Sequence, residues 1–399
     1  MLNGFDTSKW KNEGEGSFNI TAKYAEIKKT KIPLARLKYC ESIAEPGKTY
    51  KFSVKCESEA CKDINAAYAM VSLYKEDGSS ITRKYADKTD LHGVKECTFK
   101  VPEDCVKIGI ELGLKGSGYV RWSKPELEET ETSEKRIVRV ASARLAGAKT
   151  TAEALKNIEA VVDKAGKQNV DVIIMSEIIN DLGCGLPVTE TAQTTGGEYC
   201  TLMKAKARQY NTYIVMNFHE KDENGIYNTS LLIDRNGEIA GKYRKTHISF
   251  GEWEKGITPG EELPVFETDF GRVGMLICWD MYFPETARIM TLKGAELLLV
   301  STVGDPAFRH VSRAMENGVY VAVSGSQYHN LNDCRVKPSK IIAPDGEILA
   351  QTDEVGDAAI AEIDLNDKKQ MYWLSIPAAY SVPNNIYMNE RRPELYKEI

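Results

Sequence analysis

Hydrophobic and polar residues follow two different patterns along this chain. Up to about residue 128, apolar and polar side chains alternate over short runs such as residues 50–55 and 97–101, and turn signals such as Asp77-Gly78 separate the runs. A period of two with frequent turns and almost no helical spacing is typical of an antiparallel β-sandwich. We therefore predict an all-β sandwich domain over residues 1–128.

The second pattern begins after a polar, acidic stretch at residues 129–135, which we predict to be a linker. Apolar strands, such as the run at residues 172–175, then alternate with segments whose apolar residues recur at helical spacing. The first of these segments follows Thr150, which begins a capping-box sequence. Alternating strands and helices predict an α/β domain, here over residues 136–369.

The last stretch, residues 370–399, contains three prolines and several aromatic residues. Proline interrupts the hydrogen bonds of a helix, so this stretch cannot form one long helix. We predict an extended C-terminal arm that packs on its own domain or on a partner subunit.

Three reactive side chains directly follow predicted strands of the α/β domain, where open α/β folds gather their chemistry. Glu177 follows residues 172–175, and burial there would make its carboxylate a better base, although an N-cap or an exposed turn acid fits the same position. Lys245 lies in a cation-rich run at residues 242–247, which alone would indicate a solvated edge strand.

The third side chain, Cys278, ends the most apolar predicted strand, residues 273–277. A predicted helix begins at Pro284, and a nearby helix N-terminus lowers the pKa of a thiol and offers backbone N–H groups to an oxyanion. A core cysteine is the alternative interpretation. Because Cys278, Glu177 and Lys245 together supply a nucleophile, a base and a cation, we favour thiol-based acyl transfer.

Residues 136–365 resemble the nitrilase, or carbon–nitrogen hydrolase, superfamily. The motifs that carry this resemblance are Met175-Ser176-Glu177, Gly241-Lys242-Tyr243-Arg244-Lys245-Thr246-His247, Ile277-Cys278-Trp279-Asp280 and Phe283-Pro284-Glu285. The resemblance implies an α-β-β-α four-layer sandwich that forms a homodimer or higher homo-oligomer through its helices, and a reaction without metal or cofactor.

The resemblance also implies a mechanism through a thioester intermediate. Glu177 takes the thiol proton, and Cys278 attacks a carbonyl or nitrile carbon. Lys245 and the backbone N–H of Trp279 stabilise the oxyanion. Ammonia or an amine leaves, and water then cleaves the thioester.

Members of the superfamily often carry a second glutamate before a Pro-Gly turn. We prefer Glu254 for this role, because an acid followed by a lysine ahead of Pro259-Gly260 is the commoner form. The spacing is one residue short, so Glu252 remains open.

Departures from the family pattern narrow the range of expected substrates. Cys278-Trp279-Asp280 is closer to amide and ureide hydrolases than to the Cys-Trp-Glu of nitrile-cleaving members. Met281 and Tyr282 stand where members that clamp a substrate carboxylate carry paired arginines, which disfavours an anionic N-carbamoyl amino acid. We expect Trp279, Asp280 and Tyr282 to contact the substrate.

The N-terminal half weakly resembles jelly-roll carbohydrate-binding modules, through residues 46–52 and 118–123. Four aromatic residues could stack on a sugar ring: Trp10, Tyr74, Tyr119 and Trp122. We prefer the alternative that they form the sandwich core, because aromatic residues on strands are mostly buried. A role in packing or oligomerisation is as well supported as glycan binding.

The charge and composition of the chain argue against several classes of function. The net charge of −6 leaves no basic stripe for nucleic acid, and no apolar run approaches the ~20 residues that span a membrane. The N-terminus shows no signal peptide, so we expect a cytoplasmic protein whose nine cysteines are reduced. The five histidines show no metal-ligand spacing.

We therefore predict a metal-free hydrolase of non-peptide carbon–nitrogen bonds, in an amide or an N-carbamoyl amine. One alternative is a nitrilase that acts on nitriles. The other is a catalytically idle glycan-binding protein whose working part is the β-sandwich, and the presence of all three reactive residues weighs against it.

Overall fold

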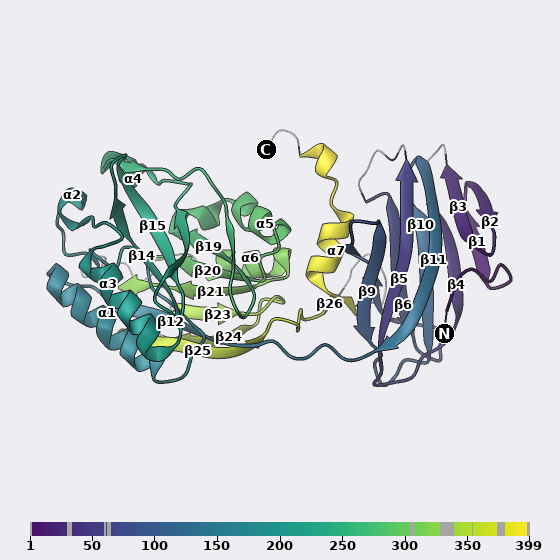
Figure 1. Ribbon diagram of the computed structural model, residues 1–399, viewed down its shortest axis with the longest axis horizontal. Helices are drawn as coiled ribbons and strands as arrows, with labels where there is room; N and C mark the ends of the chain where they lie inside the picture. Colours follow the sequence, from purple (N-terminus) through teal and green to yellow (C-terminus); the bar gives the residue numbers. More distant parts are fainter. Residues whose placement is uncertain are drawn as a thin grey trace. The chain divides into compact units, whose positions relative to one another are not determined.

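The computed structural model describes residues 2–29, 34–59, 61, 65–303, 307–327, 339–352, 354–372 and 380–396. The chain divides into two compact units (Figure 1). The β unit contains Met1–Glu134 and Gln370–Ile399, and the α/β unit contains Lys135–Lys369. Among the helices of the described residues, none combines the length and hydropathy needed to cross a membrane.

The β unit consists of two sheets whose long strands pair antiparallel, which confirms the predicted β-sandwich. The first sheet has the order β1-β4-β10-β6-β7-β27-β26, and the second has the order β2-β3-β11-β5-β9-β8. The strands are β1 (Trp10–Gly14), β2 (Ser17–Ile20), β3 (Tyr24–Lys29), β4 (Ala35–Ile43), β5 (Thr49–Glu59), β6 (Ala67–Tyr74), β7 (Ser80–Tyr85), β8 (Lys88–Thr89), β9 (Val94–Lys100), β10 (Lys107–Leu114), β11 (Gly118–Thr130), β26 (Met371–Tyr372) and β27 (Tyr380–Ser381).

The inward-facing residues of the two sheets form one apolar core. Trp122 is fully buried in it, and Trp10 is 4% exposed and packs between Phe5 and Tyr39. These two tryptophans therefore belong to the core, as preferred, and cannot stack on a sugar ring. Tyr74 and Tyr119 are half-buried.

The C-terminal segment completes the β unit. Its helix α7 (Pro383–Glu390) is followed by the short turn η2 (Pro393–Leu395). Asn385 of α7 is buried and pairs with the backbone of Tyr85, accepting from its N–H at 2.8 Å and donating to its C=O at 3.0 Å. The expected extended arm is thus helical over these residues; Pro377 lies outside the described part.

The α/β unit contains two further sheets. The first has the order β16-β15-β14-β13-β12-β22, with β25 paired to β12 and β17 paired to β15, and the second has the order β18-β19-β20-β21-β23-β24. Their strands are β12 (Ile137–Ala146), β13 (Val172–Ile174), β14 (Tyr213–Lys221), β15 (Ile226–Ile233), β16 (Ile239–Arg244), β17 (Ile257–Thr258), β18 (Val265–Glu267), β19 (Arg272–Ile277), β20 (Leu297–Ser301), β21 (Tyr320–Ser324), β22 (Ser326–Gln327), β23 (Ser339–Ile342), β24 (Ile348–Thr352) and β25 (Asp357–Asp364). The helices are α1 (Thr151–Gly166), α2 (Val188–Thr191), α3 (Glu198–Tyr210), α4 (Phe250–Glu254), α5 (Pro284–Leu292) and α6 (Ala307–Asn317).

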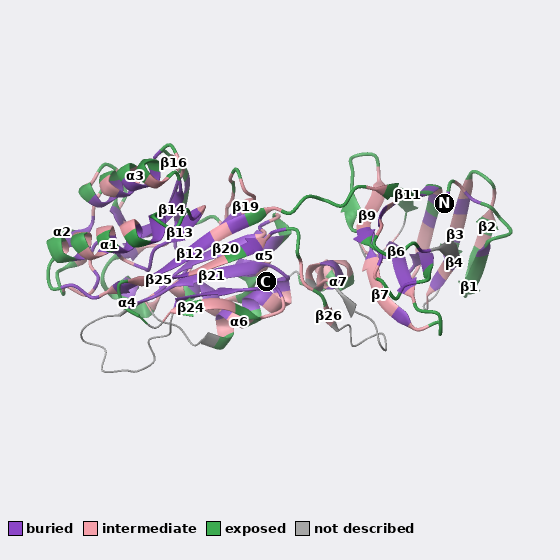
Figure 2. Cartoon of the chain, turned by 90° about the horizontal axis from the view of Figure 1, so that it is seen from below, coloured by how far each residue is buried: buried purple, intermediate pink, exposed green. Residues whose placement is uncertain are grey.

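Strand alternation produces the layers of the α/β unit, because successive side chains point to opposite faces of a sheet. On β13, Val172 and Ile174 join the core that the two sheets share, whereas Ile173 packs in the core with α1 and α3. Helices α5 and α6 contact the second sheet through β19, β21 and β23. The result is the predicted α-β-β-α sandwich, and Figure 2 shows its central strands as largely buried.

Candidate active site

Cys278 lies at the turn that follows strand β19. It begins the short 3-10 helix η1 (Cys278–Tyr282), and its φ of 42° lies in the left-handed region. A residue other than glycine costs about 1–2 kcal/mol there, so the surrounding structure must hold this conformation. Cys278 is half-buried, and Glu177 and Thr302 are within side-chain hydrogen-bonding reach of its thiol.

The thiol is protonated at neutral pH. Enclosure by protein atoms, together with the charge of Glu177, raises the pKa of Cys278 to about 12, and Lys245 opposes this effect only in part. The expected lowering of this pKa by a helix N-terminus is therefore wrong. Helix α5 begins only at Pro284, and burial is the largest cause of the raised pKa of Cys278. Because a thiol is a poor nucleophile, reaction at Cys278 requires a base.

Glu177 is positioned to be that base. It follows β13, is 3% exposed, and accepts a hydrogen bond from the backbone N–H of Val303 at 3.1 Å. Its other oxygen accepts from Lys245 Nζ and from Asn228 Nδ2, both at 2.9 Å. The carboxylate is thus held by three donors while it lies beside the thiol.

Lys245 follows β16 and is 2% exposed. Its Nζ lies 2.9 Å from Glu177 Oε1 and 2.8 Å from Glu252 Oε2. Burial alone would lower the pKa of Lys245, but the negative charges of Glu177 and Glu252 outweigh it and raise the pKa. A permanent buried cation therefore faces the reactive cysteine.

Glu252, and not Glu254, is the second glutamate that the structure brings to this group. Glu252 is buried on α4, and its carboxylate also accepts from the backbone N–H of Ser249 in a capping box. Burial would raise the pKa of Glu252, but Lys245 outweighs it and lowers the pKa. Glu254 is exposed two residues further on, because one turn of helix cannot point both side chains inward. The preference for Glu254 is therefore wrong.

Asn228 is a member of the site that the sequence reasoning missed. It lies on β15, is fully buried, and its amide donates to Glu177 Oε1 and to Glu252 Oε1, both at 2.9 Å. Its own oxygen accepts from Asn217 at 2.9 Å. An asparagine that opens the polar run Asn228-Thr229-Ser230 between the apolar residues of β15 was the available signal, because buried polar groups need partners.

The three residues expected to contact the substrate have different surroundings. Trp279 is 36% exposed and stacks on the half-buried Tyr282, with ring centroids 4.2 Å apart. Arg309 covers the Tyr282 ring at 3.7 Å. Asp280, in contrast, is fully buried, and protein donors occupy both of its oxygens, so its prediction as a substrate contact is corrected.

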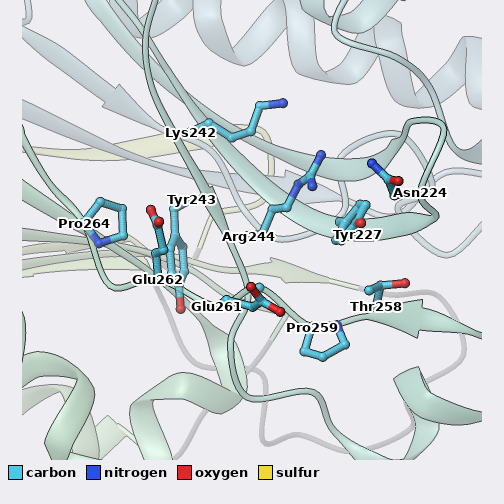
Figure 3. Close-up of a pocket in the computed structure, with 11 residues that line it drawn as sticks. Asn224, Tyr227, Lys242, Tyr243, Arg244, Thr258, Pro259, Glu261, Glu262 and Pro264 are labelled. Carbon is cyan, nitrogen blue, oxygen red and sulfur yellow. The ribbon is translucent and has the colours of Figure 1, made fainter.

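A separate cavity of about 500 Å³ lies beside β16 (Figure 3). It is lined by Asn224, Tyr227, Lys242, Tyr243, Arg244, Thr258, Pro259, Gly260, Glu261, Glu262 and Pro264. Cys278 and Glu177 are absent from this lining. Its two cations are already paired, since Lys242 and Arg244 both donate to the buried Glu220. We therefore assign it no part in the chemistry.

Across the described ranges, no three His, Cys, Asp or Glu side chains are grouped so that they could hold a metal ion. His329 and Cys334 lie outside these ranges. The reactive groups of the described site are the thiol of Cys278, the carboxylates of Glu177 and Glu252, and the ammonium group of Lys245.

This four-layer sandwich, with reactive residues at its strand ends, is the nitrilase-like fold. Residues 139–372 match the family model described as carbon-nitrogen hydrolase, and the chain belongs to this family. The resemblance predicted from the motifs is thereby confirmed at the level of the family.

Curated relatives have several activities. A probable nitrilase of Schizosaccharomyces pombe is 33% identical over 245 residues, which cover 58% of this chain and 86% of that protein. A citrullinase of Francisella tularensis subsp. tularensis is 32% identical over 291 residues, which cover 66% and 98%. An N-carbamoylputrescine amidase of Arabidopsis thaliana is 30% identical over 223 residues, which cover 49% and 71%.

Solved structures share the fold. A carbon-nitrogen hydrolase from Helicobacter pylori G27 superposes with a TM-score of 0.56 at 21% identity, covering 66% of this chain and 98% of that one. An amidase from Nesterenkonia sp. AN1 gives a TM-score of 0.54 at 20% identity, covering 67% and 99%.

The two glutamates on α4 provide a matched pair of variants. We expect Glu252→Gln to lower kcat about 10²-fold or more, because the buried ammonium of Lys245 loses one of its two anionic partners. Glu254→Gln changes the same atoms on the solvent-exposed side and should leave kcat within twofold of wild type. Steady-state kinetics of both variants measures this difference. Equal losses in the two variants would contradict the assignment of Glu252.

Proposed function

We propose that this protein hydrolyses the carbon–nitrogen bond of an amide or an N-carbamoyl amine, with Cys278 as nucleophile, Glu177 as general base and Lys245 as oxyanion-stabilising cation. The observation that carries the proposal is the 2.9 Å contact between Lys245 Nζ and Glu177 Oε1 beside the Cys278 thiol. These groups supply what acyl transfer through a thioester requires.

The reaction begins with proton transfer from the Cys278 thiol to Glu177, as the sulfur attacks the carbonyl carbon. Negative charge moves to the carbonyl oxygen, where Lys245 and the backbone N–H of Trp279 stabilise it. The carbon–nitrogen bond then breaks, and Glu177 returns its proton to the leaving nitrogen. Water, deprotonated by Glu177, cleaves the thioester and restores the thiol.

The charges of the site favour this reaction order. Glu177 and Glu252 carry two negative charges against the single positive charge of Lys245 while the thiol is neutral. Transfer of the thiol proton to Glu177 moves one negative charge to sulfur and keeps it next to the ammonium. No charge leaves the buried site in this step, so it avoids a desolvation cost.

The amide or ureide substrate is supported by two observations. The sequence after the nucleophile reads Trp279-Asp280 rather than Trp-Glu. Two relatives are named for N-carbamoyl or ureido substrates, the citrullinase and the N-carbamoylputrescine amidase. A nitrile substrate is the second candidate, supported by the relative named as a probable nitrilase.

Ammonia release tests the proposal. We expect wild-type protein to release ammonia from one class within a panel of primary amides, N-carbamoyl amines and nitriles, and expect EDTA to leave the rate unchanged. The substrate that releases ammonia identifies the class. Detection of the second product, a carboxylic acid from an amide or a nitrile and an amine from an N-carbamoyl amine, checks that the carbon–nitrogen bond was hydrolysed. Release only from nitriles would replace the amide proposal by the nitrile one, and loss of activity in EDTA that a divalent metal restores would contradict the mechanism.

A further inference from the structure

The carboxylate of Asp280 is fully buried and receives hydrogen bonds from two separate segments of the α/β unit. Its Oδ2 accepts from the backbone N–H of Ile277 at 3.0 Å and from the hydroxyl of Tyr243 at 2.7 Å. Its Oδ1 accepts from the backbone N–H of His247 at 3.1 Å and from the hydroxyl of Thr246 at 3.3 Å. The same oxygen lies 3.1 Å from His247 Nδ1.

These partners bracket two of the reactive residues. Cys278 lies in the chain between Ile277 and Asp280, and Lys245 lies between Tyr243 and Thr246. One carboxylate therefore joins the turn that carries the thiol to the strand end that carries the ammonium. The bond from Ile277 also closes the turn in which Cys278 has its left-handed backbone conformation.

The surroundings of the Asp280 carboxylate require an ionised acid on a side chain as short as that of aspartate. Four contacts of the Asp280 carboxylate, from Ile277, Tyr243, Thr246 and the His247 backbone, come from donors, and an ionised carboxylate only accepts. An asparagine would turn an NH₂ group toward two of these donors. A glutamate would keep the charge but insert an extra methylene into a fully buried space, where close packing leaves no room.

We propose that Asp280 is a positioning residue that sets the placement of the Lys245 ammonium relative to the Cys278 thiol. It does not touch the substrate, because its carboxylate has no exposed surface. The inference rests on the proposed function, in which these two groups act together. It predicts that loss of the Asp280 contacts moves the cation away from sulfur and weakens its support of the thiolate.

Alkylation of Cys278 measures this placement without any substrate. Wild type, Asp280→Asn and Asp280→Glu are treated with iodoacetamide at pH 8, and peptide mass spectrometry follows each cysteine. Half-buried Cys56 in the β unit is the internal reference, and buried Cys200 on α3 reports unfolding of the α/β unit. We expect Cys278 to react at least tenfold more slowly in both variants, while Cys56 keeps its rate.

The two variants separate positioning from a direct effect of charge, because the two explanations have opposite signs. If Asp280 acted only through its negative charge, Asp280→Asn would favour the thiolate and speed alkylation, and Asp280→Glu would change nothing. Either of these results, or unchanged rates in both variants, would overturn the proposal. With the substrate found in the ammonia panel, positioning further predicts a fall in kcat at nearly constant KM.

If Cys200 becomes reactive and shows that the α/β unit is unfolded in both Asp280 variants, Tyr243→Phe provides the test instead. This change removes one donor on the lysine side and leaves the bond from Ile277 in place. Slower alkylation of Cys278 in Tyr243→Phe supports positioning, and an unchanged rate overturns it. Alkylation needs no turnover, so failure here leaves the proposed function intact, whereas absence of Cys278-dependent turnover in wild type counts against the function alone.

Discussion

Cys278→Ala is expected to lower turnover by about 10⁴-fold or more, because removal of the nucleophile closes the covalent route. Contacts that hold the turn come from the backbone and from Asp280, and the variant retains them, so the fold should persist. Ammonia release per mole of protein, measured with a substrate from the panel, gives the rate.

The control for this variant is Cys56→Ala, which removes a half-buried thiol from the β unit. Cys56 packs against the apolar core of that unit, whereas the reactive residues belong to the α/β unit. It should retain wild-type turnover within twofold. Turnover by Cys278→Ala within a factor of ten of wild type would refute Cys278 as the nucleophile.

Lys245→Met is expected to have the second largest effect, on both turnover and stability. The oxyanion loses its charged donor, so kcat should fall about 10³-fold. Two buried carboxylates, Glu177 and Glu252, also lose the cation between them. Removal of one partner from a buried ion pair typically costs about 3–5 kcal/mol in the free energy of unfolding.

The dependence of stability on pH should reverse its sign in this variant. In wild type, the folded pKa of Glu252 is lowered, so its contribution to stability is present above its unfolded pKa of about 4.3 and is lost as the pH falls. Without the lysine, repulsion raises the folded pKa of one of the two carboxyl groups above its unfolded value. That group then costs stability as the pH rises.

Urea unfolding at pH 5 and pH 8 measures this reversal. Lys245→Met should be more stable at pH 5 than at pH 8, and wild type should not show this order. Lys242→Met, three residues earlier on β16, is the control, because Glu220 keeps Arg244 and Thr229 as partners. A Lys245→Met variant with the pH dependence of wild type would show that the two carboxylates do not share this cation.

The classes of the two domains and the three reactive residues were predictable from local pattern, whereas the four layers of the α/β unit were predicted from the family resemblance. Apolar strands with turn signals, and reactive side chains at strand ends, are features that a few neighbouring residues define. Glu177, Lys245 and Cys278 lie far apart in the sequence, but the rule that chemistry gathers at strand ends selects all of them.

The partners of these residues were not predictable in the same way. The choice between Glu252 and Glu254 depends on where α4 begins, which Ser249 and its capping box determine. Asn228 and Asp280 act through contacts with residues far away in the chain: Asn228 lies 24 positions from Glu252 and 51 from Glu177, and Asp280 lies 37 from Tyr243. Such contacts cannot be inferred from the spacing of residues in the sequence.

The division of the chain has a consequence for the order of synthesis. The α/β unit is an insertion between two parts of the β unit, since Met1–Glu134 and Gln370–Ile399 belong together. Asn385 accepts a hydrogen bond from the backbone of Tyr85, and Ile386 packs in a cluster with Tyr85, so the C-terminal segment supplies contacts to the N-terminal part of this unit. On the ribosome, the unit made first is therefore the one completed last, after the whole hydrolase unit has emerged.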